Sequence, residues 1–352
     1  MSSDYSMTFT TRTTVLAGMT VVAALATLAA PHAQLRKIDA EKLLAERFGF
    51  TAAEIGQARA GQAVTKLLPS REATEVGVAG AVRISGKPDR LVYWLKDISS
   101  FRKGAELGVS RKLSTPPQIG DFADLSLGEE ELAALKACRP GKCDLRLGDK
   151  GLARFQSEVD WAAPDAARRA NLLMRQMMLG HAQAYLKGGD AALGIAHNEK
   201  TPRVAADEFH ALLYQSTTLY ELAPAFAAYL DRFPAASLPG AEQFLYWAKG
   251  GAGPEASISL HQIVIYNAPG GDVLVADKQI YASRYTDAAI FILSLASAAD
   301  NTGYYALVGA RARSTMLGGM AARMLRGRVE KETVSTSAMY LNWIQQSLSM
   351  SR

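Results

Sequence analysis

The clearest pattern along the chain is a series of strand-like segments between Ile258 and Ser314. Strong turn residues at Asn267–Asp272 separate two segments with strand patterning. The stretch Thr286–Ala299 contains a short, strongly apolar run with an acidic residue near each end, which is typical of a buried strand. We therefore predict four consecutive antiparallel strands here, and pairing of Asn267 with Asp272 is the expected register of the first two.

Two further segments complete a body of sheet and helix. Val76–Ser85 has the composition of an early strand, and Leu317–Leu348 is a long helical segment. Within that segment, Thr333–Ser337 is rich in Thr, Ser and Val, which predicts a break or a kink. The predicted fold class is α+β: an antiparallel β-sheet, made of the late four-strand meander plus the early strand, packs against a long C-terminal helix.

The middle of the chain is predominantly helical. Apolar residues recur at helical spacing through Asp165–Lys187, and Ala241–Trp247 is predicted to be a short helix. We predict that residues 34–352 form a single domain with a large, mainly helical insertion at about 128–247.

The N-terminal segment has the order of a secretory signal peptide. Arg12 precedes an apolar run without charges, Val15–Ala30, and small residues for cleavage follow at Ala29–Ala33. We predict that residues 1–33 are a cleavable signal peptide and that the protein is periplasmic or secreted. The alternative is an uncleaved membrane anchor, although the run is short for a span.

The only two cysteines are Cys138 and Cys143, and Pro140-Gly141 lies between them. A tight turn there would bring the thiols together, and an exported protein meets an oxidising environment. We predict a local disulfide. A redox dithiol would have two intervening residues rather than four, and a zinc site would need a second pair of ligands.

Composition and motifs narrow the classes of function. Apolar residues make up 49% of the chain and the net charge is +5, which is too weak for a nucleic-acid-binding surface. Arg323, Arg326 and Arg328 predict either a solvated helix face or peripheral contact with an anionic membrane. No nucleophile-elbow, P-loop or zinc-protease motif is present, the histidine spacings match no metal site, and we predict no cofactor.

The predicted sheet carries an unusual mixture of polar and apolar positions on both faces. The alternative readings are ordinary exposure near strand ends, or a sheet that walls a partly polar cavity. Arginines at the mouth of such a cavity would suit a carboxylate or phosphate group. Under the second reading, the candidate ligand-binding residues are His261, Gln279, Tyr281, Tyr285, Arg311 and Arg313.

The early strand, the helix that follows it at Tyr93–Ile98, the late meander and the terminal helix together resemble the helix-grip architecture of START-like lipid-binding domains. The segments Lys278–Ser283 and Gly309–Ser314 are also similar to a group of secreted bacterial proteins. The resemblance implies a pocket between a curved sheet and the C-terminal helix, which would hold a lipid or another hydrophobic small molecule. The helical insertion departs from the compact family pattern.

Three hypotheses of function follow. The first is an exported binding protein for a hydrophobic molecule. The second is an enzyme on the same scaffold, hydrolase- or cyclase-like, using His261 with Tyr281 or Arg311. The third is a structural or interaction protein of the cell envelope, in which the helical middle docks a partner.

Overall fold

A computed structural model describes residues 37–349, except residues 86, 106, 140, 141, 144, 194, 197–202, 251–255, 301 and 319–321. The predicted signal peptide lies outside the described residues. Among the helices that the structure does describe, none combines the length and the apolar character that crossing a membrane requires.

The main sheet has eight strands in the order β1-β2-β10-β9-β8-β7-β6-β3, and every neighbouring pair is antiparallel. The sheet is open, with β1 and β3 at its edges. The strands are β1 (Val64–Leu68), β2 (Glu75–Ile84), β3 (Val109–Lys112), β6 (Ala241–Gly250), β7 (Ser257–Asn267), β8 (Val273–Ala282), β9 (Ala288–Ser297) and β10 (Tyr304–Arg313). The predicted α+β class, the four-strand meander and the early strand are confirmed.

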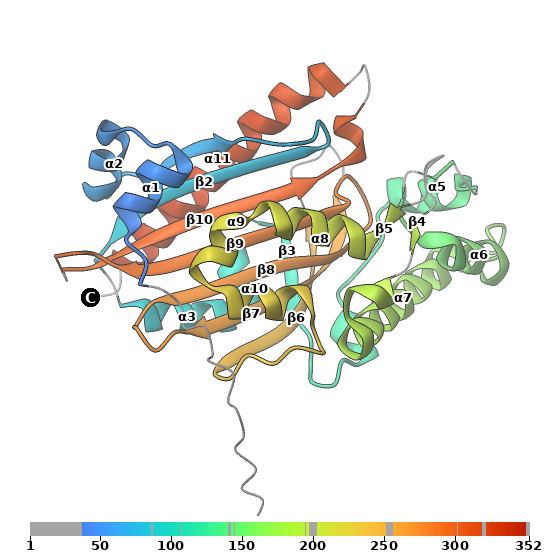
Figure 1. Ribbon diagram of the computed structural model, residues 1–352. Helices are drawn as coiled ribbons and strands as arrows, with labels where there is room; N and C mark the ends of the chain where they lie inside the picture. The colour runs from blue at the N-terminus through green and yellow to red at the C-terminus, as the bar shows by residue number, and fades with distance from the viewer. Residues whose placement is uncertain are drawn as a thin grey trace, which may run out of the picture. The chain divides into compact units, whose positions relative to one another are not determined.

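Helices cover both faces of this sheet (Figure 1). One face packs against α3 (Pro88–Lys96), α4 (Ile98–Gly104) and the long C-terminal helix α11 (Ala322–Ser349). We call it the grip face. The opposite face, which we call the outer face, packs against α1 (Ala40–Phe48), α2 (Ala52–Arg59), α8 (Ala205–Gln215), α9 (Thr217–Leu222) and α10 (Pro224–Asp231).

The helix α11 runs without interruption, so the predicted break at Thr333–Ser337 is wrong. The Thr333 hydroxyl donates a hydrogen bond to the Val329 carbonyl one turn earlier at 2.8 Å, which lets a polar β-branched residue stay in the helix. The C-terminal half of α11 inserts aromatic rings beneath α4. Phe101 lies 4.4 Å from Trp343 and 5.8 Å from Tyr340, centroid to centroid, in edge-to-face geometry.

The first part of the insertion forms a separate core beside β6, β7 and β8, while its last part supplies the outer-face helices α8, α9 and α10. The helices of the first part are α5 (Glu129–Ala137), α6 (Gly148–Glu158) and α7 (Ala166–Gly188), and the two-residue strands β4 (Ile195–Ala196) and β5 (Arg203–Val204) pair nearby. The predicted disulfide joins Cys138 and Cys143 at the end of α5. A buried ion pair ties the insertion to the sheet, with Lys278 Nζ 2.6 Å from Asp190 Oδ2.

The segment Ala241–Trp247 is not a helix, as its sequence predicted, but the first part of β6. It pairs with β7 on one side and with β3 on the other. Tyr246 enters the grip-face core while Leu245 and Trp247 enter the insertion core, so both faces are buried. An apolar run that is buried on both faces shows no alternation, and its pattern does not separate strand from helix.

The register of β7 and β8 differs from the prediction by one residue. Asn267 pairs with Val273, not with Asp272, because Asp272 belongs to the loop. Its buried carboxylate accepts hydrogen bonds from the Ile38 and Ser297 backbone amides. A slip of one residue moves every side chain of a strand to the other face relative to its neighbour.

A second irregularity lies further along the same pair of strands. Leu260 pairs with Tyr281 and His261 pairs with Gln279, which leaves Ile280 as an extra residue in β8. Because this β-bulge reverses the alternation, Gln279 and Tyr281 point to different faces.

Candidate functional site

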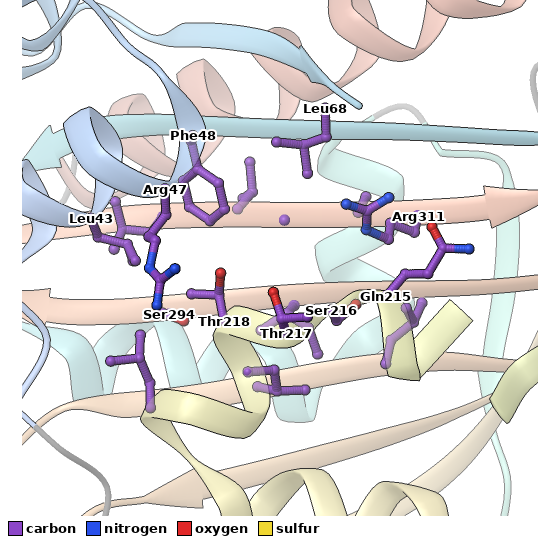
Figure 2. A pocket seen from close by; sticks show the side chains of 18 of the residues that line it. Leu43, Arg47, Phe48, Leu68, Gln215, Ser216, Thr217, Thr218, Ser294 and Arg311 are labelled. Carbon is purple, nitrogen blue, oxygen red and sulfur yellow. The ribbon is translucent and has the colours of Figure 1, made fainter. Parts of the chain in front are cut away.

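A cavity of about 330 Å³ lies on the outer face of the sheet (Figure 2). Its walls come from α1, the end of β1, α9 and the strands β8, β9 and β10. The sequence placed the ligand between the sheet and α11, whereas this cavity is on the side of the sheet opposite α11. The volume is at the lower end of the range found for small-molecule sites.

Most of the cavity wall is apolar. The apolar side chains that line it include Ile38, Leu43, Phe48, Leu68, Leu219, Leu222, Leu274, Ile290, Ile292 and Leu307. A Cβ atom added at Gly309 would meet nothing within 4 Å. The alternation along β10 places this glycine on the outer face, so the missing side chain leaves part of the space open.

Polar groups concentrate at one end of the cavity and along α9. Figure 2 shows Arg311 and Gln215 together at that end, with the Ser216, Thr217 and Thr218 side chains along the α9 wall. Arg311 Nη1 is 2.5 Å from Glu75 Oε1 and also donates to the Pro69 carbonyl at 3.3 Å. Because Glu75 is fully buried, it fixes the guanidinium and compensates part of its charge.

Two more arginines border the cavity. Arg47 extends from α1 at the end away from Arg311 and forms an ion pair with Glu221 of α9 (Figure 2). Arg71 is exposed and makes no hydrogen bond or ion pair with any residue that the structure describes. Of these three arginines, Arg47 and Arg311 are paired with carboxylates, so Arg71 supplies the one positive charge at the rim that has no described partner, while the interior of the cavity is apolar.

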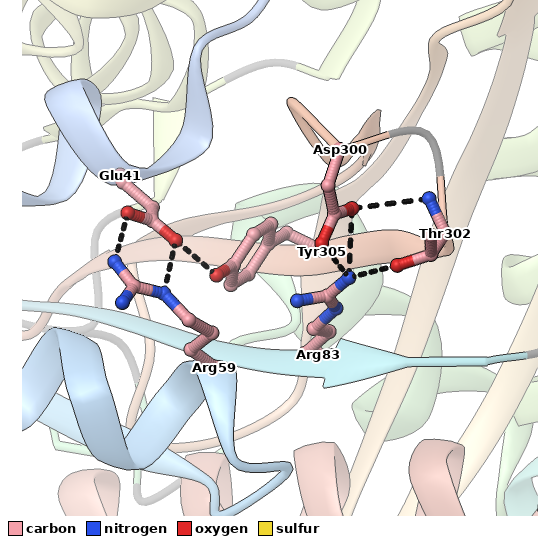
Figure 3. Close-up of polar contacts among 6 residues, drawn as sticks. All are labelled: Glu41, Arg59, Arg83, Asp300, Thr302 and Tyr305. Carbon is pink, nitrogen blue, oxygen red and sulfur yellow. Dashed lines mark hydrogen bonds and ion pairs between the residues drawn. The ribbon is translucent and has the colours of Figure 1, made fainter.

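A polar network holds the α1 wall against β10. The Glu41 carboxylate lies between Arg59 and Tyr305, with Oε1 2.8 Å from Arg59 Nε and 2.5 Å from the Tyr305 hydroxyl (Figure 3). The hydrogen bond from Arg59 lowers the pKa of Glu41 below its ordinary value. Burial and the bond to Glu41 raise the pKa of Tyr305 to about 12. Glu41 is thus ionised and Tyr305 protonated at neutral pH, which keeps both bonds intact.

A second group in Figure 3 fixes the start of β10. Arg83 Nη2 donates to Asp300 at 2.6 Å and to the Thr302 hydroxyl at 2.5 Å. The hydrogen bond from Arg83, with those from Thr302, lowers the pKa of Asp300 to about 2. These contacts join β2 to the loop that precedes β10, beside the strand that carries Arg311.

Among the predicted ligand-binding residues, only Arg311 lines the cavity. Arg313 is two residues further along β10 and forms ion pairs with Glu72 and, at 3.0 Å, with Glu208. Tyr281 donates to the Arg146 carbonyl at 2.8 Å and stacks on His181 at 4.9 Å, within the insertion core. Burial raises its pKa. The Tyr285 carbonyl accepts a hydrogen bond from the Ser314 hydroxyl, and its backbone has a φ of 61°.

His261 and Gln279 lie on the grip face. The His261 ring stacks on Tyr246 at 4.7 Å, and both of its nitrogens have polar neighbours. Nδ1 is 2.8 Å from Asp277 Oδ1, and Nε2 is 2.8 Å from the Ser259 hydroxyl. Neither Tyr281 nor Arg311, which the enzyme hypothesis paired with His261, belongs to this group. Ser259 and Asp277 were not among the residues predicted from the sequence, although Ser259 and His261 are two residues apart in one strand and so lie on the same face.

The basic residues of α11 are partly used within the protein. Arg326 donates to the Ala73 and Glu75 carbonyls and pairs with Glu330 at 2.7 Å. Arg328 is exposed, and the Arg323 side chain lies outside the described part. Among the described residues, no group of three His, Cys, Asp or Glu side chains is arranged to hold a metal ion.

Comparison with known proteins adds little. No protein-family model matches the chain, and no curated protein matches it. Among solved structures, a match is found to the di-domain ARO/CYC StfQ from the steffimycin biosynthetic pathway, with 15% identity and a TM-score of 0.21. The match covers 40% of this chain and 46% of that one. At this level of similarity, it supports no inference about the ligand or the activity of this protein.

Proposed function

We propose that the protein binds a small hydrophobic molecule with an anionic group, of the fatty-acid type, in the outer-face cavity. The observation that carries the proposal is an apolar cavity with Arg311 and Gln215 at one end. Transfer of an apolar chain from water contributes about 25 cal/mol per Å² of surface buried. The guanidinium and amide supply the few convergent polar groups that orient a ligand.

The charge of the rim favours an anion over a neutral ligand. Glu75 compensates part of the Arg311 charge, but Arg71 adds a cation without a described partner. The neighbouring hydroxyls of Ser216, Thr217 and Thr218 add hydrogen-bond donors on the α9 side. A carboxylate or a phosphate at this end would accept from several donors at once.

The proposal includes export, as the sequence of residues 1–33 indicates. The Cys138–Cys143 disulfide supports it, because disulfides persist mainly in oxidising compartments. A function outside the cytoplasm would suit a carrier or scavenger of envelope lipids.

The test begins with the full chain expressed in a bacterial host and purified without detergent. Its N-terminal sequence should start near residues 31–34, and mass spectrometry of an organic extract should find a bound acidic lipid. The delipidated protein should then bind a fluorescent anthroyloxy-labelled stearate. Gly309→Val fills the open part of the cavity and should abolish binding, and Arg311→Gln should weaken it by about 10-fold.

Arg169→Gln is the matched control, because Arg169 lies in an exposed ion pair of the insertion helix α7 and should leave binding unchanged. A protein that purifies empty and does not take up the probe contradicts the proposal. Equal binding by wild type and Gly309→Val would contradict the location of the site. If the protein is found in the cytoplasm with an intact N-terminus, the export part of the proposal is contradicted, but the proposed ligand binding is not.

A further inference from the structure

Three polar side chains on the grip face are connected in series. The Ser259 hydroxyl is 2.8 Å from His261 Nε2, and His261 Nδ1 is 2.8 Å from Asp277 Oδ1. Ser259 and His261 are two residues apart on the same face of β7, and Asp277 is on the adjacent strand β8. The group lies on the side of the sheet opposite the cavity, so it is a separate site.

Surrounding residues fix the imidazole and the carboxylate. Tyr246 stacks on the His261 ring at an interplanar angle of 15° and donates a hydrogen bond to Asp277 Oδ2. Arg102 of α4 lies over the Tyr246 ring. Burial alone raises the pKa of Asp277, but His261 and Tyr246 outweigh it and hold the pKa below its ordinary value. Asp277 is therefore ionised at neutral pH.

The ionised carboxylate determines the direction of the hydrogen bonds. It can only accept, so Nδ1 of His261 carries a proton and donates to Asp277. In the neutral imidazole, Nε2 then has a free lone pair and accepts from Ser259. This is the direction that activates a serine as a nucleophile.

The other described histidines show how the group of Ser259, His261 and Asp277 differs from an ordinary ion pair between a histidine and an aspartate. His210 also contacts an aspartate, Asp231, at 2.7 Å, but its side chain is 62% exposed. His181 is half-buried and stacks on Tyr281. Of the histidines that the structure describes, only His261 joins an aspartate to a serine. Its side chain is 15% exposed, so the site is sheltered but open to solvent.

We propose that Ser259, His261 and Asp277 form a nucleophilic site that hydrolyses a carboxylic ester. Ser259 Oγ attacks the carbonyl carbon as its proton passes to His261 Nε2, and the alcohol leaves with that proton. Water then gives a proton to His261 Nε2 and attacks the carbonyl carbon of the acyl-serine, and His261 returns that proton to Ser259 Oγ as the acid leaves. Asp277 stabilises the imidazolium in both steps.

The donor for the developing oxyanion is Gln279. It lies directly opposite His261 across β7 and β8, and its amide makes no hydrogen bond with the residues that the structure describes. The same cross-strand row continues with Ala289 and Ala312, which are both half-buried. The side chains beside Gln279 in this row are small methyl groups, and from their size we infer that the substrate class is a short-chain ester.

The test uses the full chain with a fluorophosphonate probe and with p-nitrophenyl acetate and butyrate. The wild type should be labelled on the peptide that contains Ser259 and should hydrolyse the esters. Ser259→Ala should remove the label, and both Ser259→Ala and His261→Gln should lower hydrolysis by about 1,000-fold. Gln279→Ala should lower hydrolysis by about 100-fold without preventing folding.

Ser297→Ala is the matched control. Ser297 is also a half-buried strand serine, and its hydroxyl has no partner among the described residues, so labelling and hydrolysis should be unchanged. A wild type that is neither labelled nor active overturns the proposal, as does a label on another residue or full activity in Ser259→Ala with an unchanged melting temperature. An unchanged rate in Gln279→Ala overturns its assignment as the donor.

Discussion

The two faces of the sheet differ in how they are packed: the grip face is filled by aromatic side chains, and the outer face encloses a cavity. On the grip face, α4 and α11 press aromatic rings against the strands, and Phe101, Tyr340 and Trp343 pack edge to face. On the outer face, α1 and α9 stand over β9 and β10 and enclose a cavity. The difference shows that the apolar character of a strand does not reveal which of its faces is filled.

Two glycines at neighbouring positions in the sheet show the difference in packing between the two faces. Gly80 in β2 pairs with Val308, and Gly309, the next residue in β10, pairs with Ala79. A Cβ atom at Gly80 would lie 2.8 Å from the Val64 carbonyl and 2.9 Å from a Leu341 methyl, whereas one at Gly309 would meet nothing within 4 Å. Gly80 allows close packing with β1 and α11, while Gly309 leaves space.

The largest change in the free energy of unfolding is expected when each of these two glycines is replaced by valine. Gly80→Val should lower the free energy of unfolding by about 2–3 kcal/mol, because the added atoms collide with backbone and a packed leucine. Gly309→Val should raise it by about 0.5 kcal/mol, since valine restricts the unfolded chain and suits a strand. Urea denaturation of both variants measures the difference, and equal effects would contradict the contrast between the faces.

An intermediate effect concerns the ionised Asp277 on the grip face. Asp277→Asn should lower the free energy of unfolding by about 2 kcal/mol at neutral pH, because the carboxylate accepts from both His261 and Tyr246. The folded pKa of Asp277 is below its unfolded value, so this stability is present above the unfolded pKa and is lost as pH falls through the folded pKa.

The difference in the free energy of unfolding between the wild type and Asp277→Asn should therefore become smaller as the pH falls below about 4. Urea midpoints measured at about pH 7, 4 and 3 give the comparison. A difference that stays constant over this range would show that Asp277 is not stabilised as an anion. Asp165→Asn is a control on a half-buried carboxylate that has a lowered pKa and pairs with exposed arginines, and its effect on the free energy of unfolding should be much smaller.

The smallest expected effect is on the wall of the cavity. Glu41→Gln removes the charge that joins Arg59 to Tyr305 but keeps the shape of the side chain. Because the pair with Arg59 is partly exposed, the loss of stability should be below about 1 kcal/mol. The labelled stearate should nevertheless dissociate faster, since α1 is held less firmly. Stopped-flow measurement gives the rate, and Glu46→Gln, which changes an exposed glutamate of the same helix, should leave it unchanged.

The fold was predictable where the pattern along the chain is local. The meander could be predicted from the turn after Asn267 and the apolar run at Ala288–Leu293. The helix α7 could be predicted from the helical spacing of apolar residues in Asp165–Lys187. The strand β6 was not predictable, because Phe244–Ala248 is buried on both faces and shows no alternation.

The sites were less predictable than the fold. The faces of Gln279 and Tyr281 depend on a β-bulge at Ile280, which the sequence pattern does not show. The cavity depends on α1 and α9, which are distant in sequence from the strands that they cover. Arg311 and Arg313 were both candidates because arginine at the mouth of a cavity would suit a carboxylate or a phosphate, and of the two only Arg311 lines the cavity. That Asp277 lies beside His261 and Ser259 could be recognised only once the register of β7 and β8 was known.

The pairing of β3 with β6 has a consequence for how the chain tolerates its insertion. Lys112 and Tyr246 are paired neighbours although the whole helical insertion separates them. The entropy of closing such a loop grows only with the logarithm of its length, by about 0.6 kcal/mol for each doubling. Lengthening or shortening the loops around α5, α6 and α7, which lie outside the outer-face core, therefore changes the free energy of closing the sheet very little. This part of the chain can diversify while the strands keep their order.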